Sequence, residues 1–226
     1  MMKRYAIYYV PPHGAFWQAG SAWLGWDAAS GQPALHPDLA GVDLAGLTAT
    51  PRKYGFHGTL KAPFRLAEGR TEGDLTDAVA QLARSIPAFD LEALVVSSIG
   101  GRFLALRPEG DVTALRGLCD RLVVSLEPFR APLTEAEYAR RKPEVLTAHQ
   151  RALLDQYGYP YVMDEFRFHI TLSGDLGAEP LAQARTIAEA YFAPHLPRPF
   201  AMDTIALCGE AEDGRFHILS RHTLTG

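Results

Sequence analysis

The chain has 226 residues, of which 47% are hydrophobic, as expected for a globular protein large enough to bury a core of its own. Its formal net charge of −4 and its pI near 6.1 argue against an extended nucleic-acid interface, which usually shows as a basic face. No apolar run reaches the roughly 18 residues of a membrane span, and the basic amino end lacks a cleavage site for a signal peptide. We therefore expect a cytoplasmic protein with no membrane partner, whose ligand is small and anionic.

The first half of the chain alternates between strand and helix patterns. Short runs rich in Tyr, Ile and Val end at Pro or Gly, and longer amphipathic runs begin at capping residues. In chain order we expect strands at 4–10, 55–62, 89–99 and 102–106, and helices at about 16–28, 71–86 and 111–126. The aromatic residues of the first helix, Phe16, Trp23 and Trp26, are expected in the core, with stacking on a base as the alternative. Helices that follow hairpins in this way are typical of an α+β fold.

Residues 127–165 interrupt this pattern and predict a helical insertion. A capping box at Thr134 begins a short helix, and a second helix is expected from Glu144 to Tyr157. Between them lies the basic run 140–142, which by default is a solvated face but could attract a phosphate ester. After the insertion we expect a strand at 166–173, a helix at about 179–192, and strands at 199–208 and 214–222.

The pattern after the insertion repeats the pattern before it. Phe56-His57-Gly58-Thr59-Leu60 returns as Phe168-His169-Ile170-Thr171-Leu172, and landmarks beyond each motif match. Phe89 lies 32 positions after the first His and Phe200 lies 31 positions after the second. We interpret the chain as an internal duplication of a strand, helix and hairpin unit.

Each motif places its polar side chains on one face of a strand, because alternate residues share a face. The polar faces hold, on the first strand, His57, Thr59 and Lys61 and, on the second, Arg167, His169 and Thr171. Two imidazoles can divide the work of general base and general acid at neutral pH. Hydroxyls and cations can hold the charged oxygens of a phosphate through the transition state. This combination of imidazoles, hydroxyls and cations favours phosphoester chemistry.

A metal site is the competing interpretation of two His motifs. Zinc sites usually need three or four protein ligands, and neither polar face adds a Cys, Asp or Glu to its His. We therefore expect no metal and no cofactor. Cys119 and Cys208 lie far apart in apolar runs, which predicts buried free thiols.

The two motifs, in a chain of this size with duplicated units, resemble the 2H phosphoesterase superfamily, whose LigT-like members act on cyclic phosphodiesters. The flanking residues 51–64 and 166–174 look like a bacterial branch of that superfamily often found beside phosphonate-utilisation genes. The resemblance implies one bilobal α+β domain, with two antiparallel sheets around a central cleft. The lobes would come from about 1–126 and 166–226.

The resemblance also implies roles for individual residues. Catalysis falls to His57 and His169, which would meet in the cleft. The resemblance places Thr59 and Thr171 beside them as substrate-binding residues. Alternation along the strands, and not the resemblance, adds Arg167 and Lys61, with a solvated rim position as the alternative for Lys61. Tyr54, just before the first motif, is also expected to bind the substrate.

The function that follows is a metal-independent cyclic phosphodiesterase acting on a small ribose or nucleotide cyclic phosphate. An RNA 2′,3′-cyclic end is the other substrate that the superfamily suggests, and the acidic pI favours the small molecule. Two alternatives stay open from the residues alone. One is a non-catalytic module that binds a nucleotide or an RNA end, and the other is a structural duplication whose cleft is a subunit interface.

Overall fold

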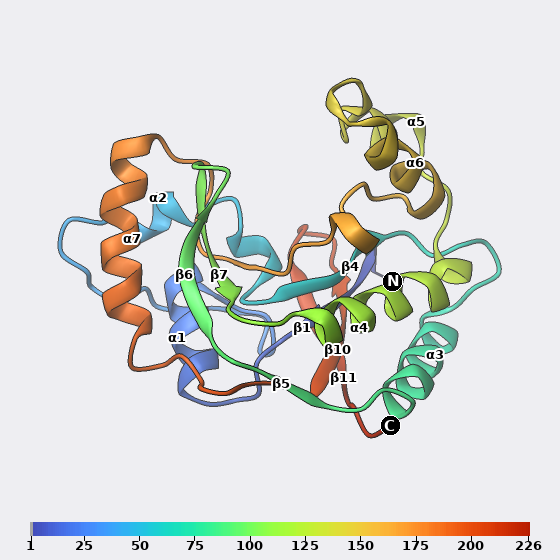
Figure 1. Ribbon diagram of the computed structural model, residues 1–226, viewed down its shortest axis with the longest axis horizontal. Coiled ribbons are helices and arrows are strands. Elements are labelled where there is room, and N and C mark those ends of the chain that lie inside the picture. The colour runs from blue at the N-terminus through green and yellow to red at the C-terminus, as the bar shows by residue number, and fades with distance from the viewer. Residues whose placement is uncertain (1) are drawn as a thin grey trace.

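A computed structural model describes residues 2–226 and has the α+β architecture that the sequence predicts (Figure 1). An antiparallel sheet of seven strands in the order β11-β10-β1-β4-β8-β7-β6 runs through its centre. The strands are β1 (Tyr5–Tyr9), β2 (Trp26–Asp27), β3 (Gln32–Pro33), β4 (Gly58–Phe64), β5 (Phe89–Leu91), β6 (Leu94–Ile99), β7 (Phe103–Pro108), β8 (Ile170–Thr171), β9 (Phe200–Met202), β10 (Thr204–Glu210) and β11 (Phe216–Thr223). The helices are α1 (Ala15–Leu24), α2 (Leu44–Leu47), α3 (Glu72–Arg84), α4 (Thr113–Ser125), α5 (Glu135–Ala139), α6 (Ala148–Tyr157) and α7 (Ala178–Phe192). Among the described residues, no helix has the length and apolar character needed to cross a membrane.

The two expected sheets are the two halves of one continuous sheet. The motif strands β4 and β8 pair with each other through Gly58 and Ile170, the middle residues of the two motifs. Separate sheets were expected because the sequence does not show that the motifs are each other's partners. Their pairing brings the repeated segments to the centre of the fold.

The hairpins of the two repeats are exchanged across this centre. The first repeat's hairpin, β6 and β7, pairs with β8 of the second motif, while β10 and β11 reach β4 through β1. The helices follow the same exchange, because α7 packs on β6 and β7 and α3 packs on β10 and β11. The predicted lobe boundaries 1–126 and 166–226 therefore divide the repeats along the chain and not the halves of the sheet.

Several element boundaries differ from the prediction. The strand expected at 166–173 is reduced to Ile170–Thr171, because the preceding residues fold as a 3-10 turn at Met163–Glu165 and then run without a sheet partner. The strand expected to end before Pro63 instead continues to Phe64. Pro63 is accommodated at a register shift between β4 and β1, where a residue without an N–H is tolerated. The helix expected from Glu144 begins at Ala148, after a capping box at Thr147.

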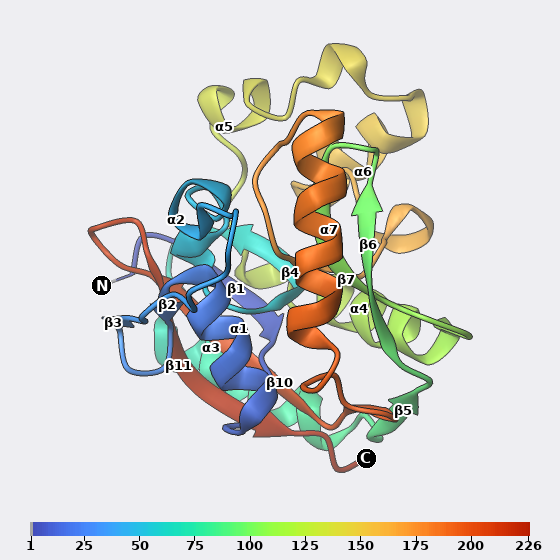
Figure 2. The same ribbon diagram turned by 90° about the vertical axis from the view of Figure 1, so that its left-hand side faces the viewer.

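The hydrophobic residues of the motifs lie in the core, as the alternation predicts. Phe56 is buried, and its ring centroid lies 5.1 Å from that of Phe16 in α1 and 6.0 Å from that of Phe192 in α7. The helices α1 and α7 are neighbours in the fold (Figure 2). Of the aromatic residues expected in the first helix, Trp23 is buried in α1 and donates its Nε1–H to the carbonyl of Leu172 at 2.8 Å. Trp26 is also buried but lies beyond the helix in β2, and Phe16 is partly buried against the core. Cys119 and Cys208 are buried free thiols, as predicted.

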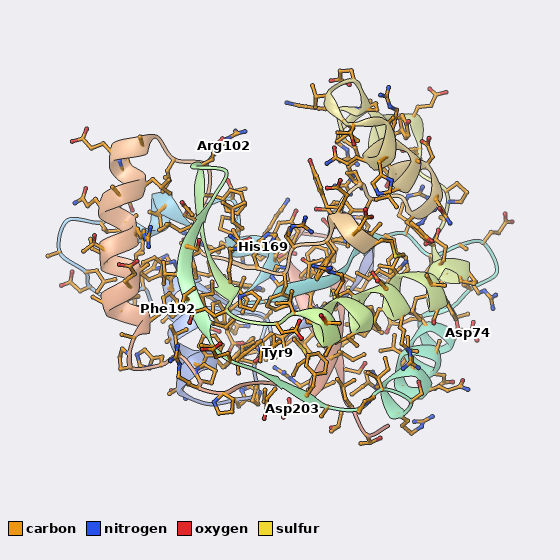
Figure 3. All side chains as sticks on the ribbon, in the orientation of Figure 1. Tyr9, Asp74, Arg102, His169, Phe192 and Asp203 are labelled. Carbon is orange, nitrogen blue, oxygen red and sulfur yellow. The ribbon has the colours of Figure 1, made fainter. Side chains whose placement is uncertain are left out.

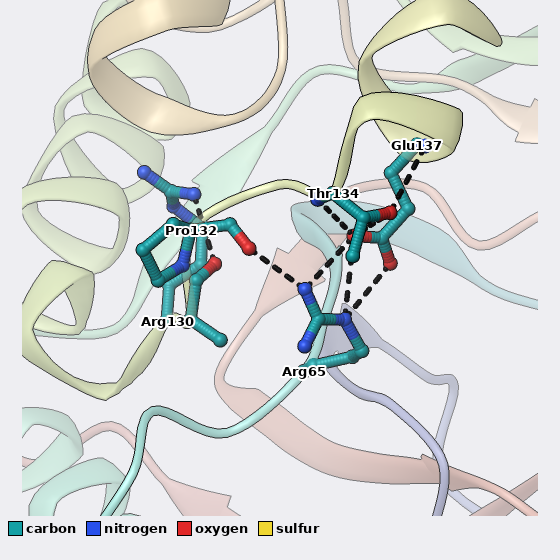
Figure 4. Close-up of polar contacts among 6 residues, drawn as sticks. Arg65, Arg130, Pro132, Thr134 and Glu137 are labelled. Atoms are coloured by element: carbon teal, nitrogen blue, oxygen red, sulfur yellow. Dashed lines mark hydrogen bonds and ion pairs between the residues drawn. The ribbon is translucent and has the colours of Figure 1, made fainter.

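The insertion at 127–165 projects from one side of the sheet as α5 and α6 (Figure 1). Arg65, just beyond β4, fastens it by donating to the carbonyl of Pro132 at 2.7 Å and to the carboxylate of Glu137 at 3.0 Å (Figure 4). Glu137 also caps α5 with Thr134, and these hydrogen bonds, that from Arg65 foremost, lower the pKa of its carboxyl to about 2. The insertion is thus held by a charged contact to the end of a motif strand.

Helix α1 approaches the first motif so closely that Gly20 has no room for a side chain. A Cβ at Gly20 would lie 2.1 Å from Cδ1 of Phe56, whereas a Cβ at Gly117 in α4 would meet nothing within 4 Å. We expect Gly20→Ala to lower the free energy of unfolding by about 1–3 kcal/mol through overpacking. The matched Gly117→Ala should raise it by up to about 1 kcal/mol, because Ala favours the helix. Urea unfolding followed by circular dichroism measures both, and a Gly20→Ala protein as stable as the parent would contradict this packing.

Candidate active site

The pairing of β4 with β8 brings the polar side chains of the two motifs together. Because Gly58 is opposite Ile170 in an antiparallel pair, the register sets His57 across from Thr171 and Thr59 across from His169. Side chains so placed have Cβ atoms about 4.5–5.5 Å apart. His57, Thr59 and Thr171 accordingly line one cavity, and Thr59 lines a second cavity with His169. The two His residues predicted to be catalytic thus lie on adjacent strands, in cavities that share Thr59.

Both imidazoles are held in the same tautomer. Nδ1 of His57 lies 2.9 Å from the carbonyl oxygen of Gly55, and Nδ1 of His169 lies 2.8 Å from that of Arg167. A carbonyl only accepts hydrogen bonds, so we assign the proton of each neutral ring to Nδ1. Nε2 is then the free basic nitrogen, and that of His57 lies 3.2 Å from Oγ1 of Thr59. In each motif the residue two places before the His orients it.

Burial keeps both rings neutral at pH 7. Burial, with a smaller contribution from the nearby His169, lowers the pKa of His57 to about 4. The ring of Tyr8 packs against that of His57, with centroids 3.9 Å apart. Burial also lowers the pKa of His169, with a smaller contribution from the charge of Arg107. Both groups are therefore ready to accept a proton.

The two imidazoles open into cavities of different character. His169 lies at the base of the space between the β6-β7 hairpin and the insertion (Figure 3). A cavity of about 520 Å³ occupies this space, and its walls include the rings of Phe103, Tyr159 and Tyr161. A cavity of about 200 Å³ on the His57 side is lined by Arg4 and Arg141 among others. The site has an apolar end and a basic end.

Most of the predicted binding residues reach these cavities. Thr59, Thr171 and Tyr54 line the cavity at His57, and the Tyr54 ring centroid is 6.0 Å from that of His57. Arg167 lines the cavity at His169, while its Nη1 donates to the carbonyls of Asp164 and of the adjacent Phe166 at 2.7 Å.

Lys61 does not share the face of His57, contrary to the prediction from alternation. Tyr8 of β1 is opposite Thr59, but Ile7 is opposite Lys61, so the register shifts by one residue between these two pairs. A shift of one residue exchanges the faces of a strand. The Lys61 ammonium therefore points away from the imidazoles, and donates to the carbonyl of Val123 at 3.0 Å and to Glu127 at 3.2 Å.

Besides Ala62 and Pro63, four residues with charged or aromatic side chains line the cavity at His57 and were not among the predicted site residues. These are Arg4, Tyr8, Arg141 and Tyr159. The signal for the first two lies in alternation along the first strand, once that strand is known to neighbour the motif. Arg141 belongs to the basic run 140–142, whose attraction for a phosphate ester the sequence raised without placing it. Among residues 2–226, no group of three or more His, Cys, Asp or Glu is arranged to hold a metal ion.

Comparison with known proteins assigns the chain to a family. A family model described as "Protein of unknown function (DUF1045)" matches residues 59–217, which include the second motif. The chain belongs to the DUF1045 family.

Two curated proteins are similar to this DUF1045 chain over most of its length. Both are named Ribose 1,5-bisphosphate phosphokinase PhnN. The protein from Janthinobacterium sp. (strain Marseille) is 40% identical over 94% of the chain and 49% of its own length. That from Laribacter hongkongensis (strain HLHK9) is 34% identical over 96% of the chain and 51% of its own length. The chain spans about half the length of these relatives.

Among solved structures, E. coli LigT in complex with 3′-AMP matches over all of both chains, with a TM-score of 0.46 and 18% sequence identity.

The lowered pKa of His57 makes the fold sensitive to acid. Above pH 6.5 the ring is neutral whether the chain is folded or unfolded, so it does not change the free energy of unfolding. Between pH 6.5 and 4 the unfolded chain takes up a proton that the folded chain refuses, and unfolding is favoured. From pH 7.5 to 4.5 we expect the parent to lose about 2–3 kcal/mol more of its free energy of unfolding than His57→Gln does. Urea unfolding at both pH values measures this, and equal losses would contradict the burial of His57.

Proposed function

We propose that the chain is a phosphoesterase that hydrolyses a cyclic phosphodiester of a small ribose or nucleotide without a metal ion. The observation that carries the proposal is the pairing of the motifs at Gly58 and Ile170, which turns two His and two Thr toward one site. Two imidazoles with free Nε2 atoms can serve both oxygens of one displacement at phosphorus. The chain's own residues supply the base and the acid that such a reaction needs.

In the proposed step, His57 takes a proton from a water molecule through Nε2 as the water oxygen attacks phosphorus. We assign the base to His57 because its lowered pKa leaves the ring unprotonated at pH 7, the form that can accept a proton. His169, protonated at Nε2 once the anionic substrate is bound, gives its proton to the departing ester oxygen. One phosphorus–oxygen bond forms and one breaks, so the ring opens to a phosphomonoester. Thr59 and Thr171 donate to the non-bridging oxygens.

The relatives and the cavities support a small ribose or nucleotide substrate. Similarity to half of proteins named for ribose 1,5-bisphosphate supports a sugar phosphate as the ligand. The rings of Phe103, Tyr159 and Tyr161 beside His169 offer surfaces on which a base or the apolar face of a sugar could pack. The two buried thiols fit a reducing cytoplasm.

Two other functions compete with hydrolysis. A module that binds a nucleotide or an RNA end without turnover is favoured by the same aromatic rings. A phosphokinase activity is suggested by the names of the relatives, but those proteins are about twice as long as the chain. The 226 residues contain no G-x-x-x-x-G-K-[S/T] motif, the loop with which P-loop kinases hold their nucleotide.

Phosphorus NMR on a panel of cyclic phosphates tests the proposal. We expect the dialysed protein to convert a ribose or nucleoside cyclic phosphate to a phosphomonoester, at a rate that a strong chelator leaves unchanged. Binding without turnover would favour the module, and activity restored only by added zinc or manganese would favour a metal enzyme. If the protein neither binds nor hydrolyses any of the cyclic phosphates, the cleft has only a structural role.

The two His residues should be essential to turnover. We expect His57→Ala and His169→Ala each to lower kcat by about 10²–10⁴, because each removes a general acid or base. The double variant should be little worse than either single variant, since both groups act in one step. Circular dichroism at pH 7.5 should show a fold equal to the parent's. A folded single variant with near-normal kcat at saturating substrate would sink the two-His mechanism.

Lys61 and Arg167 should now behave differently from each other. We expect Arg167→Ala to lower kcat/KM by about tenfold or more, because Arg167 lines the cavity at His169 and charge-assisted contacts to phosphate are strong. Arg167→Lys should also be impaired, since an ammonium cannot replace the two-pronged contact of a guanidinium. On a cyclic phosphate that carries no second phosphate group, Lys61→Met should keep kcat/KM within about twofold, because its ammonium is committed to Val123 and Glu127. The reverse order of effects would mean that Lys61 and not Arg167 contacts the substrate.

A further inference from the structure

Besides the cavities at His57 and His169, a further cavity of about 200 Å³ adjoins the cavity at His57. The two cavities share Tyr54, Tyr159, Arg4 and Arg141, so a ligand at His57 can extend from one into the other. Seven cationic side chains line this further cavity: Arg4, Lys53, Lys61, Arg65, Arg130, Arg140 and Arg141. We call it the basic cavity.

The basic cavity holds more positive charge than its carboxylates neutralise. Three carboxylates pair with its cations: Glu210 with Arg4, Glu137 with Arg65, and Glu127 with both Arg130 and Lys61. Seven cations and three carboxylates leave a net charge of +4, in a protein whose formal net charge is −4. Within residues 2–226, Lys53, Arg140 and Arg141 form no ion pair. Such a concentration of charge in a hollow attracts anions.

Aromatic rings fix two of the uncommitted cations at the boundary between the cavities. The Lys53 ammonium lies 4.9 Å from the ring centroid of Tyr54, and the Arg141 guanidinium lies 4.9 Å from that of Tyr159. Both rings also line the cavity at His57. The cations are therefore held within reach of a ligand that occupies the catalytic site.

The insertion supplies the outer wall of the basic cavity. Arg130, Arg140, Arg141 and Tyr159 all belong to residues 127–165, which have no counterpart in the other repeat. Arg65 and its hydrogen bonds to Pro132 and Glu137 hold this wall against the end of β4 (Figure 4). The duplicated core thus presents the catalytic pair, and the insertion adds a binding region on one side of it.

We propose that the basic cavity binds a second phosphate group of the substrate, a phosphomonoester remote from the ester that the two His residues attack. The proposal rests on the proposed function for the identity of that ester. A cyclic phosphodiester carries one negative charge, and the threonine hydroxyls beside the imidazoles can donate hydrogen bonds to its oxygens. The three uncommitted cations match the further charge of a monoester, close to −2 at pH 7. Arg140 and Arg141 can each donate two hydrogen bonds to it.

Kinetics on a matched pair of esters test this subsite. The pair is adenosine 2′,3′-cyclic phosphate with and without a 5′-phosphate. The readout is the ratio of kcat/KM for the doubly over the singly phosphorylated ester. The variants are Lys53→Gln and Arg140→Gln, which line the basic cavity but not the cavity at His57, and the control is Arg185→Gln, whose side chain pairs with Glu189 on the exposed face of α7.

We expect the parent and the control to prefer the doubly phosphorylated ester by at least about tenfold, and each variant to lose about tenfold of that ratio. A parent without the preference, or a preference that both variants keep, overturns the proposal. If neither ester is hydrolysed, the proposed function is wrong but the phosphate subsite is not yet tested. Calorimetric titration with ribose 5-phosphate and with ribose tests the subsite in that case. Tighter binding of ribose 5-phosphate that weakens in both variants and not in the control would then still support the subsite, and equal binding of the two sugars would overturn it.

Discussion

The backbone pair between Gly58 and Ile170 is the contact on which the fold and the site both depend. It joins the two halves of the central sheet and sets the register that brings His57 and His169 together. The glycine is required by close packing, because a Cβ at residue 58 would lie 2.3 Å from Cζ of Phe168. The Phe that precedes the second His thus fills the space that the first motif leaves open.

Some elements of the fold occur in both halves of the sheet, and others occur in only one half. The paired motifs, the exchanged hairpins and the helices α3 and α7 follow a local two-fold axis. Strand β1 and the insertion have no symmetric counterparts, and they are the elements that make the two ends of the site different. The first brings Tyr8 onto His57, and the second brings Arg141 and Tyr159. The two imidazoles therefore lie in different surroundings, as the proposed roles of base and acid would require.

The sequence predicted the features that depend on neighbouring residues and missed those that depend on distant strands. The duplication, the capping boxes and the inward Phe and Leu of each motif depend on neighbours in sequence, and they were predicted correctly. Lys61 was placed on the wrong face because the register shift that turns it depends on β1, more than fifty residues earlier. The single sheet and the exchanged hairpins escaped prediction for the same reason, since pairing partners are not written in either strand alone. Arg4 and Tyr8 enter the site only through that pairing.

The central claim is that both imidazoles act on a single phosphorus atom. A crystal structure of the protein with a ribonucleoside 2′,3′-cyclic vanadate, which mimics phosphorus during displacement, tests it most directly. The account predicts that Nε2 of His57 and Nε2 of His169 each lie about 2.6–3.2 Å from a different oxygen on the one vanadium atom. Vanadate held by one His alone, or bound away from the cavities at His57 and His169, would contradict it.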